Sequence, residues 1–243
     1  MPTGDEMTSH DDDKRAAAYA AAEEVAGGMI VGLGTGSTAA FLIARLAERV
    51  RGGLRIVAVG TSLATELAAR EVGITILPFD DLAEIDLAID GVDEIDPQLR
   101  AIKGAGGAML REKIVASAAR RMIAIGDGSK RVARLGAAPV PLEVLPLARA
   151  FVARRVESLG GVATLRQRDG RAYRTDQGNA VLDCRFEPEL FQAPLFQGDA
   201  DPATLGTQLS QIPGVLGHGL FLDEIDSAYI AADGVVTRLD RAS

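Results

Sequence analysis

A repeated order of short apolar runs and helical stretches in the first half of the chain constrains the fold most strongly. Apolar runs occupy residues 29–33, 54–59, 74–77, 87–90 and 122–125. Stretches typical of helices occupy residues 14–25, 38–50, 63–72 and 109–121. Strands that alternate with helices of about 10–15 residues form βαβ units. We therefore expect an α/β fold with a Rossmann-like, mostly parallel sheet flanked by helices.

The pattern changes after about residue 135. Residues 138–142 contain two prolines and are predicted to be extended, because proline disfavours the helical conformation of the residue before it. Helices are predicted over 145–159 and 202–212, strands over 162–168, 180–186 and 214–222, and a turn over 175–179. A hairpin over 228–239 ends the chain. We expect a smaller α+β (ferredoxin-like) domain over 135–222 that carries oligomer contacts, and a catalytic α/β domain over 1–134 and 223–243.

Composition and charge exclude several classes of protein. The 243 residues carry a formal net charge of −8, which argues against a nucleic-acid binder. The single cysteine, Cys184, cannot form an internal disulfide and is predicted to be a core thiol. There is no run of 18 apolar residues, so no membrane span is expected, and the acidic N-terminus has the wrong charge for a secretory signal. A cytoplasmic location is expected.

The first candidate site is the glycine-rich segment 32–38 (GLGTGST), which joins a predicted strand to a predicted helix. Glycines and a helix N-terminus can present backbone N–H groups to an anion, and hydroxyls can add hydrogen bonds. The G-x-G-x-G spacing differs from the dinucleotide fingerprint, and the lysine of a P-loop is absent. A glycine turn with a Ser or Thr cap remains the alternative to a phosphate cradle.

The second candidate is an apolar strand that runs into carboxylates, Asp90, Asp93, Glu94 and Asp96. In open α/β sheets, ligands bind outside the carboxyl ends of the strands, where these residues are expected to lie. A turn capped by Asp is one alternative. A divalent metal site is another, although the spacing is not that of an EF-hand loop.

The third candidate is the segment 103–107 (KGAGG), followed by a predicted helix that carries Arg111, Glu112 and Lys113. A lysine that opens a glycine loop can approach an oxyanion closely. The alternative is a solvated helix face, since a glutamate near a helix N-terminus is favourable on its own.

The three segments together suit proton transfer next to a carbonyl in a phosphorylated sugar. They offer a carboxylate base, a lysine for a negative oxygen, further carboxylates for hydroxyl groups and an anion cradle. His10 and His218 lie outside these segments, so a histidine-based hydrolase triad is unsupported.

The ordered motifs resemble those of the type A ribose-5-phosphate isomerase family. They are the segments 31–39, 90–95, 102–108, 111–113 and 126–130, with 142–146 and 212–215 later in the chain. The resemblance implies interconversion of D-ribose 5-phosphate and D-ribulose 5-phosphate in the non-oxidative pentose phosphate pathway. It also implies no cofactor, no metal and a homodimer.

The resemblance also implies roles for single residues. Glu112 would be the base that moves a proton between C2 and C1, and Asp90 would assist opening of the furanose ring. Asp93 would position Lys103, which would stabilise the enediolate oxygen. The implied substrate-binding residues are Thr35, Gly36, Ser37, Thr38, Asp90, Gly91, Val92, Asp93, Lys103, Gly104, Ala105, Gly106, Lys130 and Lys14. For Lys14, a solvated lysine remains an alternative. The chain departs from the family pattern in its acidic N-terminal extension and in a longer polar stretch over 192–202.

Three other functions fit the sequence less well. A sugar-phosphate-sensing regulator should carry a basic helix-turn-helix, whereas an acidic segment precedes the α/β part here. A nicotinamide-dependent oxidoreductase should have an acidic residue after its second strand, where Gly60 follows Val59. An aminosugar-phosphate deaminase or isomerase is expected to use a catalytic histidine.

Overall fold

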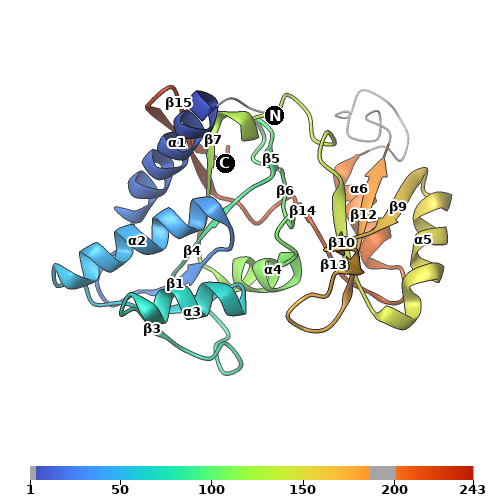
Figure 1. Ribbon diagram of the computed structural model, residues 1–243, viewed down its shortest axis with the longest axis horizontal. Coiled ribbons are helices and arrows are strands. Elements are labelled where there is room, and N and C mark those ends of the chain that lie inside the picture. Colours follow the sequence, from blue (N-terminus) through green and yellow to red (C-terminus); the bar gives the residue numbers. More distant parts are fainter. Residues whose placement is uncertain (1–3, 187–200, 243) are drawn as a thin grey trace. The chain divides into compact units, whose positions relative to one another are not determined.

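The computed structural model describes residues 4–186 and 201–242, with side chains from residue 10 onward. The chain forms two compact units, which are described separately (Figure 1). The first unit comprises Met1–Val92, Arg111–Arg131 and Asp223–Ser243, and the second comprises Asp93–Leu110 and Val132–Leu222. No helix among the described residues is long and apolar enough to cross a membrane.

A seven-stranded sheet with the order β16-β15-β7-β4-β1-β2-β3 forms the centre of the first unit. All neighbouring strands pair in parallel except β15 and β16, which form the closing antiparallel hairpin. The strands are β1 (Ile30–Leu33), β2 (Val57–Gly60), β3 (Thr75–Ile76), β4 (Leu87–Gly91), β7 (Met122–Asp127), β15 (Ser227–Ala232) and β16 (Val235–Asp240). The predicted α/β fold with a mostly parallel sheet is confirmed.

The helices of the first unit are α1 (Gly4–Ala22), α2 (Ser37–Arg51), α3 (Leu63–Glu71) and α4 (Met109–Ala118), whose first two residues belong to the second unit. Helices α1 and α2 contact each other, and both contact β7, so they cover the same face of the sheet. Their apolar residues, including Ala18, Leu42 and Leu46, are fully buried with strand residues such as Val31 and Ile89. This core fixes the carboxyl ends of β1 and β4.

The acidic N-terminal segment is helical, and the prediction of a helix limited to 14–25 is wrong. Helix α1 begins at Gly4 and ends at Ala22. Carboxylates near a helix N-terminus are favoured by the helix dipole. The buried carboxylate of Asp13 also accepts hydrogen bonds from the amides of Asp233 (3.2 Å) and Gly234 (2.9 Å), which form the turn between β15 and β16. The acidic segment is therefore part of the fold of this unit.

The second unit contains a four-stranded antiparallel sheet with the order β13-β8-β12-β9. Its strands are β8 (Val140–Val144), β9 (Gly161–Leu165), β12 (Ala180–Phe186) and β13 (Val215–His218), and its helices are α5 (Arg149–Ser158) and α6 (Pro202–Ser210). There is also a short 3₁₀ turn in each unit, η1 (Gly128–Lys130) in the first and η2 (Pro146–Ala148) in the second. Val152, Val156, Leu182 and Leu209 are buried in one core with the sheet. This arrangement is the small α+β region expected from the sequence.

Residues 93–110 group with the second unit, whereas the predicted boundary had placed them in the first domain. The reason is a three-stranded sheet of β5 (Glu94–Ile95), β6 (Ala101–Ile102) and β14 (Leu220–Phe221), in which β6 pairs with β14. The predicted strand 214–222 is accordingly divided into β13 and β14. At Gly219, between them, a Cβ atom would lie 2.2 Å from the carbonyl oxygen of Lys103. This unit also contains a hairpin of β10 (Gln167–Arg168) and β11 (Arg171–Ala172). Most of the polar stretch 192–202 lies outside the described residues.

Candidate active site

The predicted phosphate cradle forms a turn between β1 and α2 in the first unit. Gly36 is the N-cap residue of α2 and has a φ of 107°. No side chain forms a capping hydrogen bond at this helix N-terminus, so the alternative of a glycine turn with a Ser or Thr cap is not supported. Gly36 and Ser37 are exposed, whereas Thr38 is buried in the first turn of α2. A helix N-terminus with exposed residues and no side-chain cap suits an anionic group such as phosphate.

A network of hydroxyl groups holds the cradle from inside. Oγ1 of Thr35 lies 2.8 Å from Oγ1 of Thr61 and 2.9 Å from Oγ of Ser62. Oγ1 of Thr65 donates to the carbonyl oxygen of Gly34 (2.9 Å). The side chain of Thr35 is therefore turned into the protein. Sequence reasoning missed these three partners, although the segment after β2 was a signal because β1 and β2 are adjacent in the sheet.

Asp90 lies at the carboxyl end of β4 and is 3% exposed. Its Oδ1 accepts hydrogen bonds from the amides of Thr35 (3.0 Å) and Gly91 (2.7 Å). The residues that follow it, Gly91 and Val92, are half-buried and buried. The Asp90 side chain thus joins the end of β4 to the backbone of the cradle.

Glu112 lies in the first turn of α4 and is 4% exposed. Arg111 donates to the carbonyl oxygen of Gly60 (3.0 Å) and pairs with Glu66. Lys113 pairs with Glu224 at 2.8 Å. Burial raises the pKa of Glu224, but the Lys113 ammonium and the backbone amides of Asp223 and Glu224 together outweigh it, and the pKa is lowered. The alternative of a solvated Arg-Glu-Lys face is wrong. Arg111 and Lys113 both pair with carboxylates, and Glu112, which lies between them in the sequence, is buried.

Lys130 and Lys14 differ in their surroundings. Lys130 ends η1, whose N-cap, Asp127, accepts from the amide of Ser129 (3.0 Å) and contacts Nδ1 of His10 (3.3 Å). Burial raises the pKa of Asp127, but the hydrogen bonds from Ser129 together with the charges of Lys130 and His10 outweigh it, and the pKa is lowered. Nζ of Lys14 donates to Asp11 (2.9 Å), three residues earlier on α1. A substrate contact of Lys14 stays a prediction.

In the second unit, Lys103 opens the segment 103–107, which we call the lysine loop. Lys103 is 2% exposed, and its Nζ lies 5.3 Å from the centre of the Phe221 ring. Its amide donates to the carbonyl oxygen of Gly219 (2.8 Å). Oδ2 of Asp93 accepts from the amide of Ala105 (2.9 Å), so Asp93 holds the loop two residues after Lys103.

The other acidic residues of the second candidate segment have structural partners. Glu94 accepts from the amides of Gly136 (2.8 Å) and Ala138. Asp96 pairs with Arg100 at 2.6 Å. Among residues 10–186 and 201–242, no group of three potential ligands could hold a metal ion. The metal alternative gains no support from these residues.

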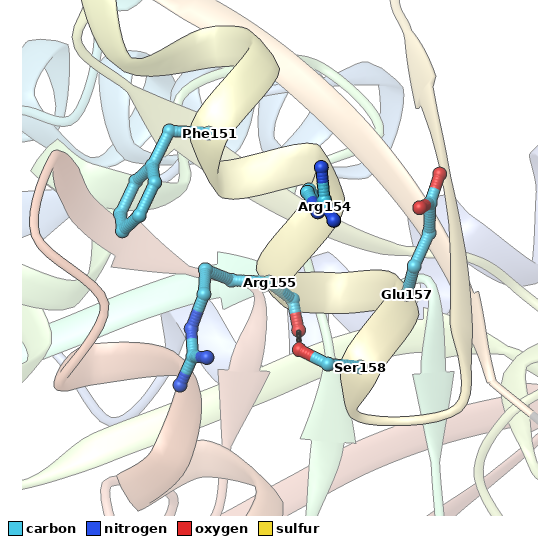
Figure 2. Close-up of a pocket in the computed structure, with 5 residues that line it drawn as sticks. All are labelled: Phe151, Arg154, Arg155, Glu157 and Ser158. Atoms are coloured by element: carbon cyan, nitrogen blue, oxygen red, sulfur yellow. Dashed lines mark hydrogen bonds between the residues drawn. The ribbon is translucent and has the colours of Figure 1, made fainter.

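Two further features involve none of the predicted site residues. A pocket on α5 is lined by Phe151, Arg154, Arg155, Glu157 and Ser158, drawn as sticks in Figure 2, and Ser158 donates to the carbonyl oxygen of Arg155 (2.7 Å). Cys184 is buried on β12, and burial raises the pKa of its thiol to about 12. A thiol with this pKa is not a nucleophile near neutral pH.

Comparison with known proteins identifies close relatives. A model of the family described as ribose 5-phosphate isomerase A (phosphoriboisomerase A) matches residues 57–234. The ribose-5-phosphate isomerase A of Sphingopyxis alaskensis is 49% identical over 224 residues, 92% of this chain and 94% of that protein. That of Roseiflexus castenholzii is 46% identical over 228 residues, 92% of this chain and 93% of that protein.

Solved structures agree with this result. The ribose 5-phosphate isomerase of Plasmodium falciparum has a TM-score of 0.86 and 34% identity, covering 96% of this chain and 100% of that chain. A D-ribose-5-phosphate isomerase in complex with phospho-erythronic acid has a TM-score of 0.87 and 35% identity, covering 96% and 99%.

Proposed function

This chain belongs to the ribose 5-phosphate isomerase A family, and on that premise we propose that it interconverts D-ribose 5-phosphate and D-ribulose 5-phosphate through an enediolate. The observation that carries the proposal is the burial of Glu112 in the first turn of α4, where its neighbours in sequence, Arg111 and Lys113, pair with other carboxylates. A base in this position is shielded from bulk water.

The first proposed step is opening of the sugar ring. Oδ1 of Asp90 accepts hydrogen bonds from two backbone amides, and these hydrogen bonds orient the carboxylate at the end of β4. We assign to Asp90 the transfer of the proton between the ring oxygen and the C1 hydroxyl group. A carboxylate that is held rigidly does not have to be reoriented for this step.

The second proposed step is proton transfer between carbons. The carboxylate of Glu112 takes the proton from C2, and the electron pair of that C–H bond forms the enediolate double bond. Glu112 then returns the proton to C1, while the proton of the C2 hydroxyl group moves to the C1 oxygen. The result is the ketose, with no net gain or loss of protons or electrons.

Lys103 and the lysine loop are proposed to stabilise the negative oxygen of the enediolate. Lys103 is 2% exposed, so its ammonium group acts in a medium of low dielectric constant, where its charge is screened less than in water. Asp93 contributes by holding the amide of Ala105, and Gly104 and Gly106 allow the backbone to approach the substrate.

The phosphate group is proposed to bind at the N-terminus of α2. The exposed backbone of Gly36 and Ser37, the Thr38 hydroxyl group and the ammonium group of Lys130 supply donors and positive charge. Lys14 is proposed as a second cation. We also expect phospho-erythronic acid to bind this chain, because its carboxylate is planar and charged like an enediolate and it carries a phosphate.

Three broader expectations remain proposals of this kind. They are a place in the non-oxidative pentose phosphate pathway, a homodimer and a cytoplasmic location.

The test is formation of ribulose 5-phosphate from ribose 5-phosphate by the purified protein in excess chelator. We expect full activity, because Lys103 supplies the positive charge that a divalent ion would otherwise provide. A protein that is inactive on ribose 5-phosphate with and without added metal would overturn the proposal. Activity that is lost in chelator and restored by magnesium or manganese would instead favour the metal alternative.

A further inference from the structure

The backbone of the lysine loop is held by an arginine from another part of the second unit. Nη1 of Arg166, which lies between β9 and β10, donates to the carbonyl oxygens of Gly104 (2.9 Å) and Ala105 (3.0 Å). Hydrogen bonds from a cation to a carbonyl are stronger than neutral ones and polarise the peptide. Two successive peptide groups after Lys103 are therefore oriented by one guanidinium group.

Arg166 is itself fixed by a carboxylate. Its Nε donates to Oδ2 of Asp183 (2.9 Å), and its Nη2 pairs with Oδ1 of the same residue. Asp183 lies on β12, in the middle of the four-stranded sheet, and the Arg166 side chain is only 14% exposed. A two-point pair of this type leaves the guanidinium plane little freedom to rotate.

The peptide that joins Gly104 to Ala105 is held at both ends. Its carbonyl oxygen accepts from Arg166, and its amide donates to Oδ2 of Asp93 at 2.9 Å. Because a peptide group is planar, two partners on opposite edges determine its orientation. Asp93 and Arg166 therefore act on the same peptide group from opposite sides.

Tyr173 holds the end of the lysine loop. Its hydroxyl group donates to the carbonyl oxygen of Gly106 (3.1 Å). Its ring packs against Gly107, where a Cβ atom would lie 2.4 Å from the tyrosine oxygen. Gly107 also has a φ of 85°, so only glycine suits this contact and this conformation.

We propose that Arg166, held by Asp183 and assisted by Tyr173, is a positioning residue that presents the lysine loop for stabilisation of the enediolate. This inference rests on the proposed function. Stabilisation of a developing charge requires donors that are already oriented before the reaction. Loss of Arg166 would remove its hydrogen bonds to the Gly104 and Ala105 carbonyl oxygens and leave the contact of Asp93, while the Lys103 side chain stays chemically intact.

The test compares Arg166→Ala with Arg185→Ala. Arg185 is a matched control, because it also donates to a backbone carbonyl in this unit, that of Ala137 (3.1 Å), outside the lysine loop. We expect Arg166→Ala to lower kcat by about 10- to 100-fold, the effect of a small misplacement of a catalytic group, with KM changed less than about threefold. Arg185→Ala should retain the wild-type kcat. Thermal melts establish that both variants are folded.

Chemical rescue separates positioning from a general loss of stability. Guanidinium ion at low millimolar concentration should restore part of the kcat of Arg166→Ala, because it can occupy the vacated place beside Asp183, and should leave Arg185→Ala unchanged. Arg166→Lys should be only partly active, since an ammonium group cannot form the two-point pair. A folded Arg166→Ala variant with a kcat within about threefold of wild type would overturn the inference.

Amide hydrogen exchange gives a readout that does not depend on the reaction. We expect faster exchange at Ala105 and Gly107 in Arg166→Ala than in wild type, because the loop loses its carbonyl partners. Unchanged exchange at these two amides would contradict the inference even if the protein is inactive. If wild type fails to isomerise ribose 5-phosphate but exchange is still faster in Arg166→Ala than in wild type, the proposed function is wrong. The role of Arg166 in holding the lysine loop would then still be supported.

Discussion

Oδ1 of Asp90 accepts a hydrogen bond from the amide of Thr35 at 3.0 Å, which joins the end of β4 to the glycine turn after β1. Between these strands, Gly34 leaves no room for a side chain, since a Cβ atom there would lie 2.0 Å from Oδ1 of Asp90. The amide of Gly34 also donates to the carbonyl oxygen of Ile89 (2.9 Å). The proposed phosphate cradle and the proposed ring-opening carboxylate therefore cannot move independently.

This relationship predicts the effect of Gly34→Ala. The added methyl group must displace either the Asp90 carboxylate or the turn, so we expect kcat/KM to fall by at least about 10²-fold and stability to fall by about 1–3 kcal/mol. Gly27→Ala is the control, because a Cβ atom there would lie 4.0 Å from its nearest neighbour. Steady-state kinetics and thermal melts measure both effects, and wild-type kinetics in Gly34→Ala would contradict the close contact.

Lys103→Met is expected to lower kcat by at least about 10²-fold, the scale of losing one oxyanion stabiliser. Interactions that are stronger in the transition state than in the ground state affect kcat and not only KM. Because Lys103 is buried, thermal melts must accompany the kinetics. A folded variant in which only KM changes would show that the lysine anchors substrate and does not stabilise the enediolate.

Thr38→Ala is expected mainly to raise KM. Contacts to phosphate are similar before and during proton transfer, so the loss should be about 1.5–3 kcal/mol in kcat/KM, as for one hydrogen bond to a charged group. Thr38→Ser keeps the hydroxyl group and should stay close to wild type. A fall in kcat at unchanged KM would place Thr38 in the chemical step.

The buried carboxyl group of Glu143 predicts a pH dependence of stability. Thr175 and Asn179 donate to its Oε1 at 2.8 Å, and Oε2 accepts no hydrogen bond from the described residues. Burial raises the pKa of Glu143, although these two hydrogen bonds lower it in part. The native state therefore binds this proton more tightly than the unfolded state does.

The contribution of Glu143 to stability is accordingly present below its unfolded pKa of about 4.3 and is lost as the pH rises through the raised native pKa. We expect the free energy of unfolding of Glu143→Gln, relative to wild type, to increase as the pH rises above the unfolded pKa of Glu143 and to level off once the pH has passed the raised native pKa. Denaturant titrations at a series of pH values measure this difference. A constant difference, or one that decreases with pH, would contradict an ionisable carboxyl group buried at this position.

The sequence predicted the elements whose signal is local. The apolar runs at 29–33 and 87–90 became β1 and β4 because buried parallel strands need continuous apolar residues. The glycine loops were recognisable for the same reason, since their conformations need glycine at fixed places. The helical acidic segment was missed because the hydrogen bonds of Asp13 come from a turn 220 residues later.

The contacts that support the site residues could not be predicted from sequence patterns. Arg166 is 62 residues from Gly104 in the sequence. No periodic pattern of residues relates the position just after β9, where Arg166 lies, to the lysine loop before α4. The strand β6 has two residues, too few for an alternating pattern, so its pairing with β14 and the grouping of 93–110 were not predicted.

The most direct test of the account is the turnover of ribose 5-phosphate by Glu112→Gln, measured beside wild type in excess chelator. The amide keeps the shape of the side chain but cannot accept the proton from C2, and a general base contributes about 10²- to 10⁴-fold. We predict that wild type forms ribulose 5-phosphate, and that the folded variant binds the substrate with nearly unchanged affinity but loses turnover to at least that extent. Turnover by Glu112→Gln within about threefold of wild type would contradict the assignment of Glu112 as the base.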